Sequence, residues 1–298
     1  MKYVITGSLG HIGKPLTETL IKAGNEVTVI TSKPEHASQI EALGAKAAVG
    51  LVDDVDFLTK TFSGANAVYT MVPTKFDAMN VKQWHEQMGK TYVQALKAAN
   101  IKYVVNLSSV GAHMAEGAGP VSGLHRTEAA LNTLSDVNIK HLRPCYFYHN
   151  LLANVGLIKN MNIMGANFEV SDKKFGIVHP NDIASAAAEE LMRLDFKGHT
   201  IRYIGSDDVS TDEIAKTIGN AIGKSDLKWV VFSDEQALQG MLGAGLSEEL
   251  AKSYVEMGTA INSGEMYSDY RKNHPALGKT KLEDFAKEFA AMYNVGNS

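Results

Sequence analysis

Three glycines near the start of the chain, Gly7, Gly10 and Gly13, constrain its fold more than any other feature. They follow the β-branched run Tyr3–Thr6 and precede an amphipathic segment over 12–23, so they predict a strand, a tight turn and a helix. In such a turn the first glycine permits the bend, the second lets the backbone approach a phosphate, and the third allows close helix–strand packing. The pattern predicts a dinucleotide with its diphosphate at the N-terminus of the first helix.

Strand patterns rich in β-branched residues alternate with helical patterns as far as residue 143. The predicted strands after the first are residues 26–31, 45–49, 67–71, 103–107 and 139–143, and helices are predicted over 35–43, 78–99 and 123–134. This alternation is typical of crossover units and of a parallel sheet that is buried on both faces. We therefore expect an α/β fold, a Rossmann doubly wound parallel sheet with a small C-terminal α+β substrate lobe.

The alternation becomes less regular after Pro144. We expect residues 1–150 to form an NAD(P)-binding core. Residues 151–298 are expected to form mainly the C-terminal lobe, with some segments returning to the core.

Local signals predict three features of this second half. Ser210 and Glu213 form a capping-box pattern that predicts a helix start. Asp182 is expected to cap the helix that follows it. The methionine- and glycine-rich segments 241–245 and 257–266 suggest a pliable lid.

The composition excludes several classes of function. The 298 residues carry a net charge of −4 without a basic patch, so no nucleic-acid partner is expected. The single cysteine, Cys145, excludes an internal disulfide and reads as a small buried apolar residue. No apolar stretch approaches the length of a membrane span. Together these features predict a cytoplasmic protein with no membrane partner.

The end of the second strand favours one nicotinamide cofactor over the other. An acidic residue there selects NAD, but residues 30–34 contain no carboxylate. Ser32 and Lys33 are suited instead to bind a 2′-phosphate, so we expect NADP(H), with NAD(H) left open. The other residues expected to line the cofactor lie in the glycine loop or at strand ends: His11, Ile12, Met71, Val72, Pro73, Ser108, Ser109, Tyr146 and Phe147.

The chain lacks the acid–base pair of the common short-chain dehydrogenases and sugar epimerases. Their chemistry needs a tyrosine followed four residues later by a lysine that lowers the phenol pKa. None of the eleven tyrosines has lysine at that offset, and residues 123–131 stand where the pair would fall. A nucleotide-sugar epimerase is therefore disfavoured.

Ordered motifs give the chain a resemblance to a known family. They are Val4–Gly13, Ser108-Ser109, His125-x-Thr-Glu128, Leu142–Leu152, Val178–Ala184 and Lys281–Phe285. In this order the chain resembles the NmrA-like branch of atypical short-chain dehydrogenase/reductases, which includes bacterial NAD(P)H:quinone oxidoreductases and triphenylmethane reductases. The resemblance implies a Rossmann core, dinucleotide binding and a small C-terminal substrate lobe. Leu51 departs from the family, which often carries an acid there, and Asp53 or Asp54 is left as a possible substitute.

The resemblance leaves two kinds of function open, because the family mixes reductases with redox sensors. The first is hydride transfer from NAD(P)H to a quinone-like or conjugated small-molecule acceptor. The second is a non-catalytic dinucleotide sensor that acts through a protein partner. The sequence does not decide between them or give the oligomeric state.

Candidate catalytic residues are few. His125 is the leading one, because the family carries histidine there and imidazole donates a proton near neutral pH, although a structural role is equally open. Tyr146 and Tyr148 are weaker candidates that packing also explains. Val110 and Asn150 are expected near the substrate, and no metal site is predicted.

Overall fold

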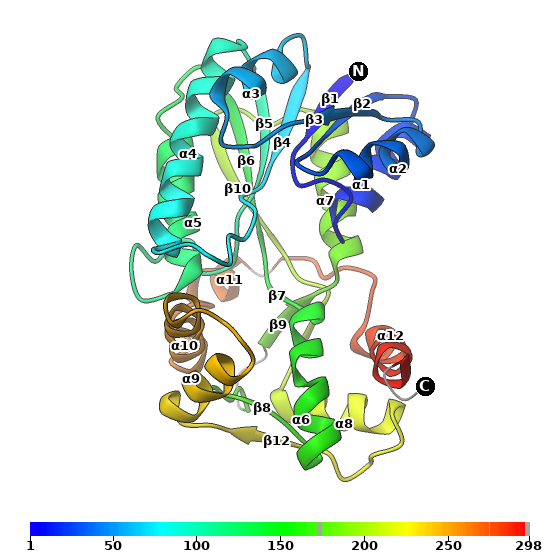
Figure 1. Cartoon of the computed structure of the whole chain (residues 1–298), viewed down its shortest axis with the longest axis vertical. Coiled ribbons are helices and arrows are strands. Elements are labelled where there is room, and N and C mark those ends of the chain that lie inside the picture. The colour runs from blue at the N-terminus through cyan, green and yellow to red at the C-terminus, as the bar shows by residue number, and fades with distance from the viewer. Residues whose placement is uncertain (172–174, 274, 296–298) are drawn as a thin grey trace.

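The computed structural model describes residues 1–171, 175–273 and 275–295, which form two lobes stacked along the long axis of the molecule (Figure 1). The upper lobe holds one large sheet between helices, and the lower lobe holds two small sheets among further helices. No helix of the described residues combines the length and the apolar character needed to cross a membrane.

The upper lobe contains a seven-stranded sheet in which every neighbouring pair of strands is parallel. In spatial order the strands are β10 (His199–Ile204), β6 (Asn138–Pro144), β5 (Tyr103–Leu107), β4 (Ala67–Thr70), β1 (Lys2–Ile5), β2 (Glu26–Thr31) and β3 (Lys46–Val49). The order reverses beside β1, and this switch point is where ligands bind in open α/β sheets. The predicted parallel Rossmann sheet is confirmed.

Helices cover both faces of this sheet, and each face has its own apolar core. One face carries α1 (Gly13–Lys22), η1 (Pro34–His36), α2 (Ala37–Ala42) and α7 (Pro180–Arg193), and the other carries α3 (Val55–Phe62), α4 (Val81–Ala98) and α5 (Pro120–Leu131). All four residues of β4 are buried, as expected for a central strand covered on both sides.

The lower lobe is built around β9 (Phe175–Val178), which pairs parallel to β7 (Tyr146–Phe147) and antiparallel to β11 (Asp207–Val209). A second parallel pair joins β8 (Ile163–Ala166) to β12 (Lys228–Val231). The remaining elements are η2 (Tyr148–Asn154), α6 (Val155–Met161), α8 (Thr211–Ala221), α9 (Asp234–Gly243), α10 (Glu248–Asn262), α11 (Ser268–Asn273) and α12 (Leu282–Val295). Between β9 and β11 the chain returns to the upper lobe as α7 and β10.

The predicted cap of α7 is wrong. The cap is His179, whose Nδ1 accepts a hydrogen bond from the backbone N–H of Asn181, because Pro180 takes the first helical position. Asp182 lies inside the first turn, where its carboxylate accepts hydrogen bonds from the Ser206 hydroxyl (2.5 Å) and the Thr280 N–H (3.1 Å). It therefore ties α7 to the segment before α12.

The segment predicted as a pliable lid is largely helical. Residues 241–243 complete α9, which Ser233 and Gln236 begin with a full capping box, and residues 257–262 complete α10. Met266 is buried rather than mobile on the surface. The capping box predicted at Ser210 and Glu213 is confirmed at the start of α8.

Candidate functional site: a dinucleotide cradle at the ends of the parallel strands

The three glycines occupy positions with different steric demands. Gly7 has a φ of +94°, and a Cβ there would lie 2.8 Å from Cγ of Met71. A Cβ at Gly13 would collide with the carbonyl oxygen of Ser8. A Cβ at Gly10 would meet only the Gly7 oxygen, at 3.6 Å, so the space beside this residue is open. Open space of this kind is what a phosphate needs to approach the backbone of a glycine loop.

A chain of hydroxyl groups connects the glycine loop to the end of β2. The Ser8 hydroxyl donates to Oγ1 of Thr31 at 3.2 Å, and the Thr31 hydroxyl lies 3.4 Å from the Lys33 carbonyl oxygen. Nδ1 of His36 lies 3.3 Å from Oγ of Ser8. His36 thus brings a second basic group to the place where Ser32 and Lys33 are exposed. The sequence analysis missed it, although Pro34 signals the turn that carries it there.

The residues after β3 include two exposed aspartates, one of which has a structural role. Leu51 is exposed, and the Asp54 carboxylate caps α3 by accepting a hydrogen bond from the Phe57 N–H at 3.0 Å. Asp53 is exposed beside it. Of these two aspartates, Asp53 is therefore the better candidate for an acid near the adenine, since the Asp54 side chain already caps α3.

The end of β4 lies directly against the glycine loop. The Met71 N–H donates to Oγ1 of Thr6 at 2.9 Å, and its carbonyl oxygen accepts from the Tyr92 hydroxyl at 2.6 Å. Val72 is buried, and the Pro73 carbonyl accepts from the indole N–H of Trp84. These bonds fix the backbone of residues 71–73 beside Gly7.

The end of β5 carries a buried hydroxyl group without a partner among the described residues. Oγ of Ser108 is fully buried there, although its backbone N–H is bonded to Leu142. The neighbouring Ser109 hydroxyl instead donates to the Val110 carbonyl at 2.9 Å, and Val110 is buried. A buried hydroxyl that lacks a partner is costly, so the carboxyl end of β5 is suited to a polar ligand such as a ribose or a carboxamide.

The aromatic residues after β6 belong mainly to the apolar core of the lower lobe. Tyr148 is fully buried and stacks on Phe285 with ring centroids 5.0 Å apart. Tyr146 packs edge-on against Phe168, and its N–H donates to the Tyr267 hydroxyl. Burial raises the pKa of both the Tyr146 and Tyr148 phenols, which keeps them protonated.

The other residues after β6 differ in their exposure. Phe147 is half-buried, whereas Asn150 is exposed. Burial also raises the pKa of the Cys145 thiol, as suits an inert core cysteine.

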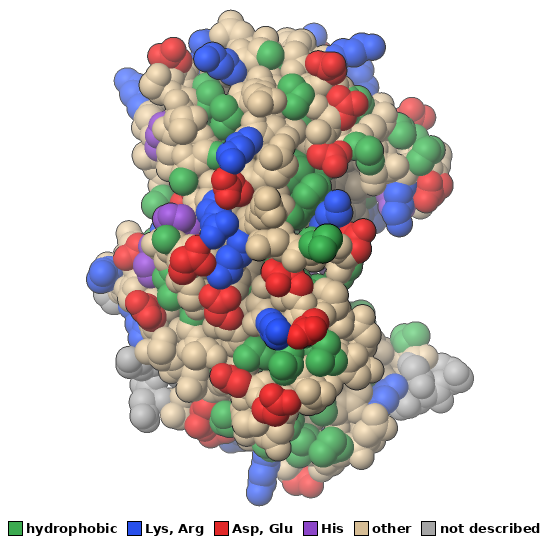
Figure 2. Space-filling view, turned by 60° about the vertical axis from the view of Figure 1, so that its left-hand side comes forward, with side chains coloured by type: hydrophobic (Ala, Val, Ile, Leu, Met, Phe, Trp, Pro, Cys, Tyr) green, Lys and Arg blue, Asp and Glu red, His purple; other side chains and the backbone are tan. Residues whose placement is uncertain are grey.

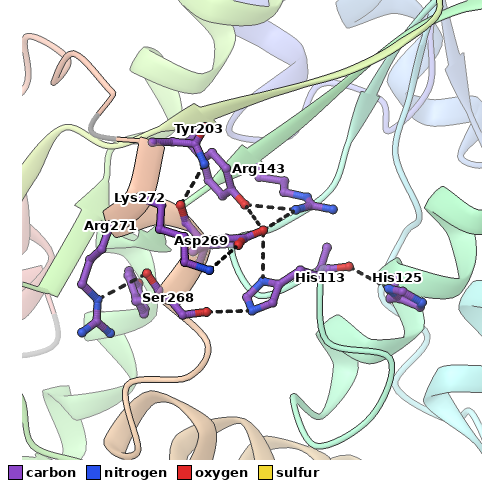
Figure 3. Close-up of polar contacts among 12 residues, drawn as sticks. His113, His125, Arg143, Tyr203, Ser268, Asp269, Arg271 and Lys272 are labelled. Carbon is purple, nitrogen blue, oxygen red and sulfur yellow. Dashed lines mark hydrogen bonds and ion pairs between the residues drawn. The ribbon is translucent and has the colours of Figure 1, made fainter.

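His125 lies on α5 with its Nδ1 2.9 Å from the carbonyl oxygen of Ala112, so that Nδ1 carries the proton (Figure 3). It lines a cavity of about 230 Å³ between α5, β6 and the edge strand β10, with further histidines and polar groups: His113, Glu128, Asn132, His141 and His199. Ala112 follows the strand end that carries Ser108. The contact of His125 therefore fixes the loop after β5. Within the described residues, no hydrogen bond joins His125 to Tyr146, Phe147 or Asn150.

A buried polar network fastens α5 and α11 to β6, and Figure 3 shows the part of it that joins Arg143 to Tyr203 and Asp269. Arg143 binds the Glu128 carboxylate through two nitrogens, at 2.6 and 3.0 Å, and the Tyr203 hydroxyl at 3.0 Å. That hydroxyl in turn donates to Asp269 at 3.2 Å. Despite the burial of its guanidinium, Arg143 has a raised pKa because Glu128 stabilises the cation.

Ser268 and His113 lie beside this network, with Ser268 Oγ 3.1 Å from Nε2 of His113. The other ring nitrogen of His113 lies 4.0 Å from the Asp269 carboxylate, which is beyond hydrogen-bond reach. The three residues therefore do not form the relay that activates a nucleophilic serine.

Comparison with known proteins agrees with this geometry. Residues 7–143 match a family model described as NAD(P)H-binding. An NAD(P)H azoreductase from Xenophilus azovorans is 22% identical over 254 residues, which is 85% of each chain.

Solved structures share the fold over nearly the whole chain. An NADPH-dependent quinone oxidoreductase from Escherichia coli, solved with NADPH, has a TM-score of 0.81 at 19% identity and covers 96% of this chain and 99% of its own. The Citrobacter sp. triphenylmethane reductase with NADP(H) has a TM-score of 0.79 at 21% identity, covering 97% of this chain and 100% of its own. The resemblance to these reductases expected from the sequence motifs is confirmed.

Proposed function

We propose that this chain, whose residues 7–143 are an NAD(P)H-binding domain, is an NADPH-dependent reductase of small, planar, conjugated acceptors such as quinones. The observation that carries the proposal is the open side of Gly10, where the loop accepts a diphosphate at the start of α1. The azo, quinone and dye reductases among the similar proteins support this class of acceptor.

In the proposed complex, the ends of β1, β2, β4 and β5 each contact a different part of NADPH. The glycine loop holds the diphosphate, and the basic groups of Lys33 and His36 with the Ser32 hydroxyl hold the 2′-phosphate. The Ser108 hydroxyl gains a partner at the nicotinamide end. Met71, fixed against Gly7, supports the cofactor from the side of β4.

Bound NADPH supplies the hydride. The chain contributes position, exclusion of water and an apolar surface, with Val110, Tyr146, Phe147 and Asn150 proposed to line the acceptor. A quinone that receives a hydride becomes a hydroquinone anion, which takes its proton from water. This chemistry does not require the tyrosine–lysine pair that the chain lacks.

We propose a positioning role for His125 rather than proton donation. Its protonated nitrogen already donates to the Ala112 carbonyl, so the imidazole restrains the loop that carries Ser108 and Val110. Figure 2 shows an indentation between the two lobes at its right-hand edge, and we propose that the acceptor enters there.

The test is steady-state oxidation of NADPH with a panel of quinones, azo dyes and triphenylmethane dyes. We expect turnover with several acceptors, and loss of cofactor binding in Gly10→Val, whose side chain would enter the path of the phosphate. Gly156→Val is the matched control, because a Cβ at Gly156 meets nothing within 4 Å. Tight NADPH binding without turnover of any acceptor would instead identify a dinucleotide sensor.

A further inference from the structure

Three histidines from three separate elements gather beside the glycine loop. His11 follows Gly10 in the loop, His149 lies on η2, and His179 caps α7. The rings of His11 and His149 are 4.5 Å apart, and those of His149 and His179 are 5.5 Å apart. Glu288, from α12, contributes the one carboxylate of the group.

The hydrogen bonds of His179 argue against a metal ion as the occupant, although His149, His179 and Glu288 have ligand atoms within 4.8 Å of one another. Nδ1 of His179 accepts the Asn181 N–H, so the neutral ring carries its proton on Nε2. That nitrogen lies 3.3 Å from the Glu288 carboxylate and donates to it. A metal would need the lone pair of Nε2, and binding one would break the cap of α7.

His149 has a buried ring nitrogen, Nδ1, without a hydrogen bond among the described residues. Its ring contacts the ring of His11 at an interplanar angle of 36°. His11 is adjacent to the open side of Gly10, where the diphosphate approaches. His149 therefore lies, through its contact with His11, close to the loop that we propose binds the diphosphate.

We propose that His11 and His149 form an imidazole pair that binds the cofactor diphosphate and takes up a proton when NADPH binds. This rests on the proposed cofactor site and adds a contact and a linked proton to it. Without the anion, the pKa of His149 is lowered, first by burial and then by His11 and His179, with Glu288 acting in the opposite direction. A diphosphate favours the protonated ring, so the complex binds more protons than the free protein.

The sign of the pH effect follows from this difference. Affinity for NADPH rises as the pH falls from the pKa of His149 in the complex towards its lowered pKa in the free protein, by up to about tenfold per unit for one proton. Above the pKa of the complex, affinity no longer depends on this proton. The diphosphate has no pKa in this range, but the 2′-phosphate of NADPH does. The proton uptake that belongs to His149 is therefore the part that the His149 variants lose.

The test is calorimetric titration of the chain with NADPH in buffers of different ionisation enthalpy, between about pH 6 and about pH 8. We expect net proton uptake by the parent chain. His149→Phe keeps the ring and removes its nitrogens, and we expect roughly tenfold weaker binding with uptake reduced by half or more. His149→Gln tests the same contact with a smaller amide donor. His199→Phe, on the edge strand β10, is the control and should behave like the parent.

Parent-like affinity and proton uptake in both His149 variants would overturn the inference. Loss of NADPH affinity on adding a chelator would also overturn it, in favour of a metal bridge. Failure of the parent chain to bind NADPH would instead refute the proposed function, so the two failures are distinguishable.

Discussion

Arg143 and Glu128 form a bidentate ion pair in which both side chains are only 6% exposed. The pair joins the end of β6 to the middle of α5, so it anchors the helix that carries His125 to the strand that precedes Tyr146 and Phe147. A buried carboxylate and guanidinium that satisfy each other are tolerated, whereas either one alone is a buried, uncompensated charge.

Glu128→Ala is therefore expected to lower the free energy of unfolding by about 3–5 kcal/mol, measured by urea denaturation. The matched control is Glu189→Ala. Glu189 pairs with Arg193 and Arg202 on the surface, where its side chain is 45% exposed, and its loss should cost about 1 kcal/mol or less. Equal losses in the two variants would contradict the buried ion pair as the anchor.

The parallel sheet was predictable because strand and helix periodicities alternate, and the glycine turn was predictable because its spacing between a strand and a helix is local. The contact that Gly7 leaves room for, with Met71, was not predictable because Met71 lies far away in the sequence. The cap of α7 was not predictable. Pro180 starts the helix two residues before Asp182, and the Asp182 carboxylate instead accepts hydrogen bonds from Ser206 and Thr280, which lie far away in the sequence. The hydrogen bond of His125 to the Ala112 carbonyl was not predictable either, because it joins a helix to the loop before it.

Basic groups at the end of β2 are expected to select NADPH. Lys33→Ala and His36→Ala should each weaken NADPH binding by about tenfold or more, since a charge-assisted hydrogen bond contributes roughly 1.5–3 kcal/mol. Binding of NADH, which lacks the 2′-phosphate, should stay within about twofold. Fluorescence titration with both cofactors measures this. A parent chain that binds NADH more tightly than NADPH would contradict it.

His125→Ala is expected to lower kcat less than tenfold, because its bonded nitrogen positions a loop and does not serve the acceptor. His125→Gln, which keeps a donor for the Ala112 carbonyl, should recover much of the loss. General acid catalysis would instead cost about 10²-fold in both variants. Steady-state kinetics with the best quinone of the panel decides between the two roles.

Ser108 and Ser109 are adjacent, but the Ser109 hydroxyl is bonded, whereas the buried Ser108 hydroxyl has no partner among the described residues. Ser108→Ala should therefore leave the stability of the free chain unchanged or raise it by about 1 kcal/mol. The same variant should bind NADPH about tenfold more weakly, because the bound cofactor loses a donor in a buried place. Ser109→Ala, the matched control, removes a local bond to Val110 and should leave NADPH affinity within about twofold.

Thermal unfolding of the free chain and fluorescence titration of NADPH measure the two effects of Ser108→Ala separately. A clear loss of stability in Ser108→Ala with unchanged affinity would show that this hydroxyl serves the fold and not the cofactor.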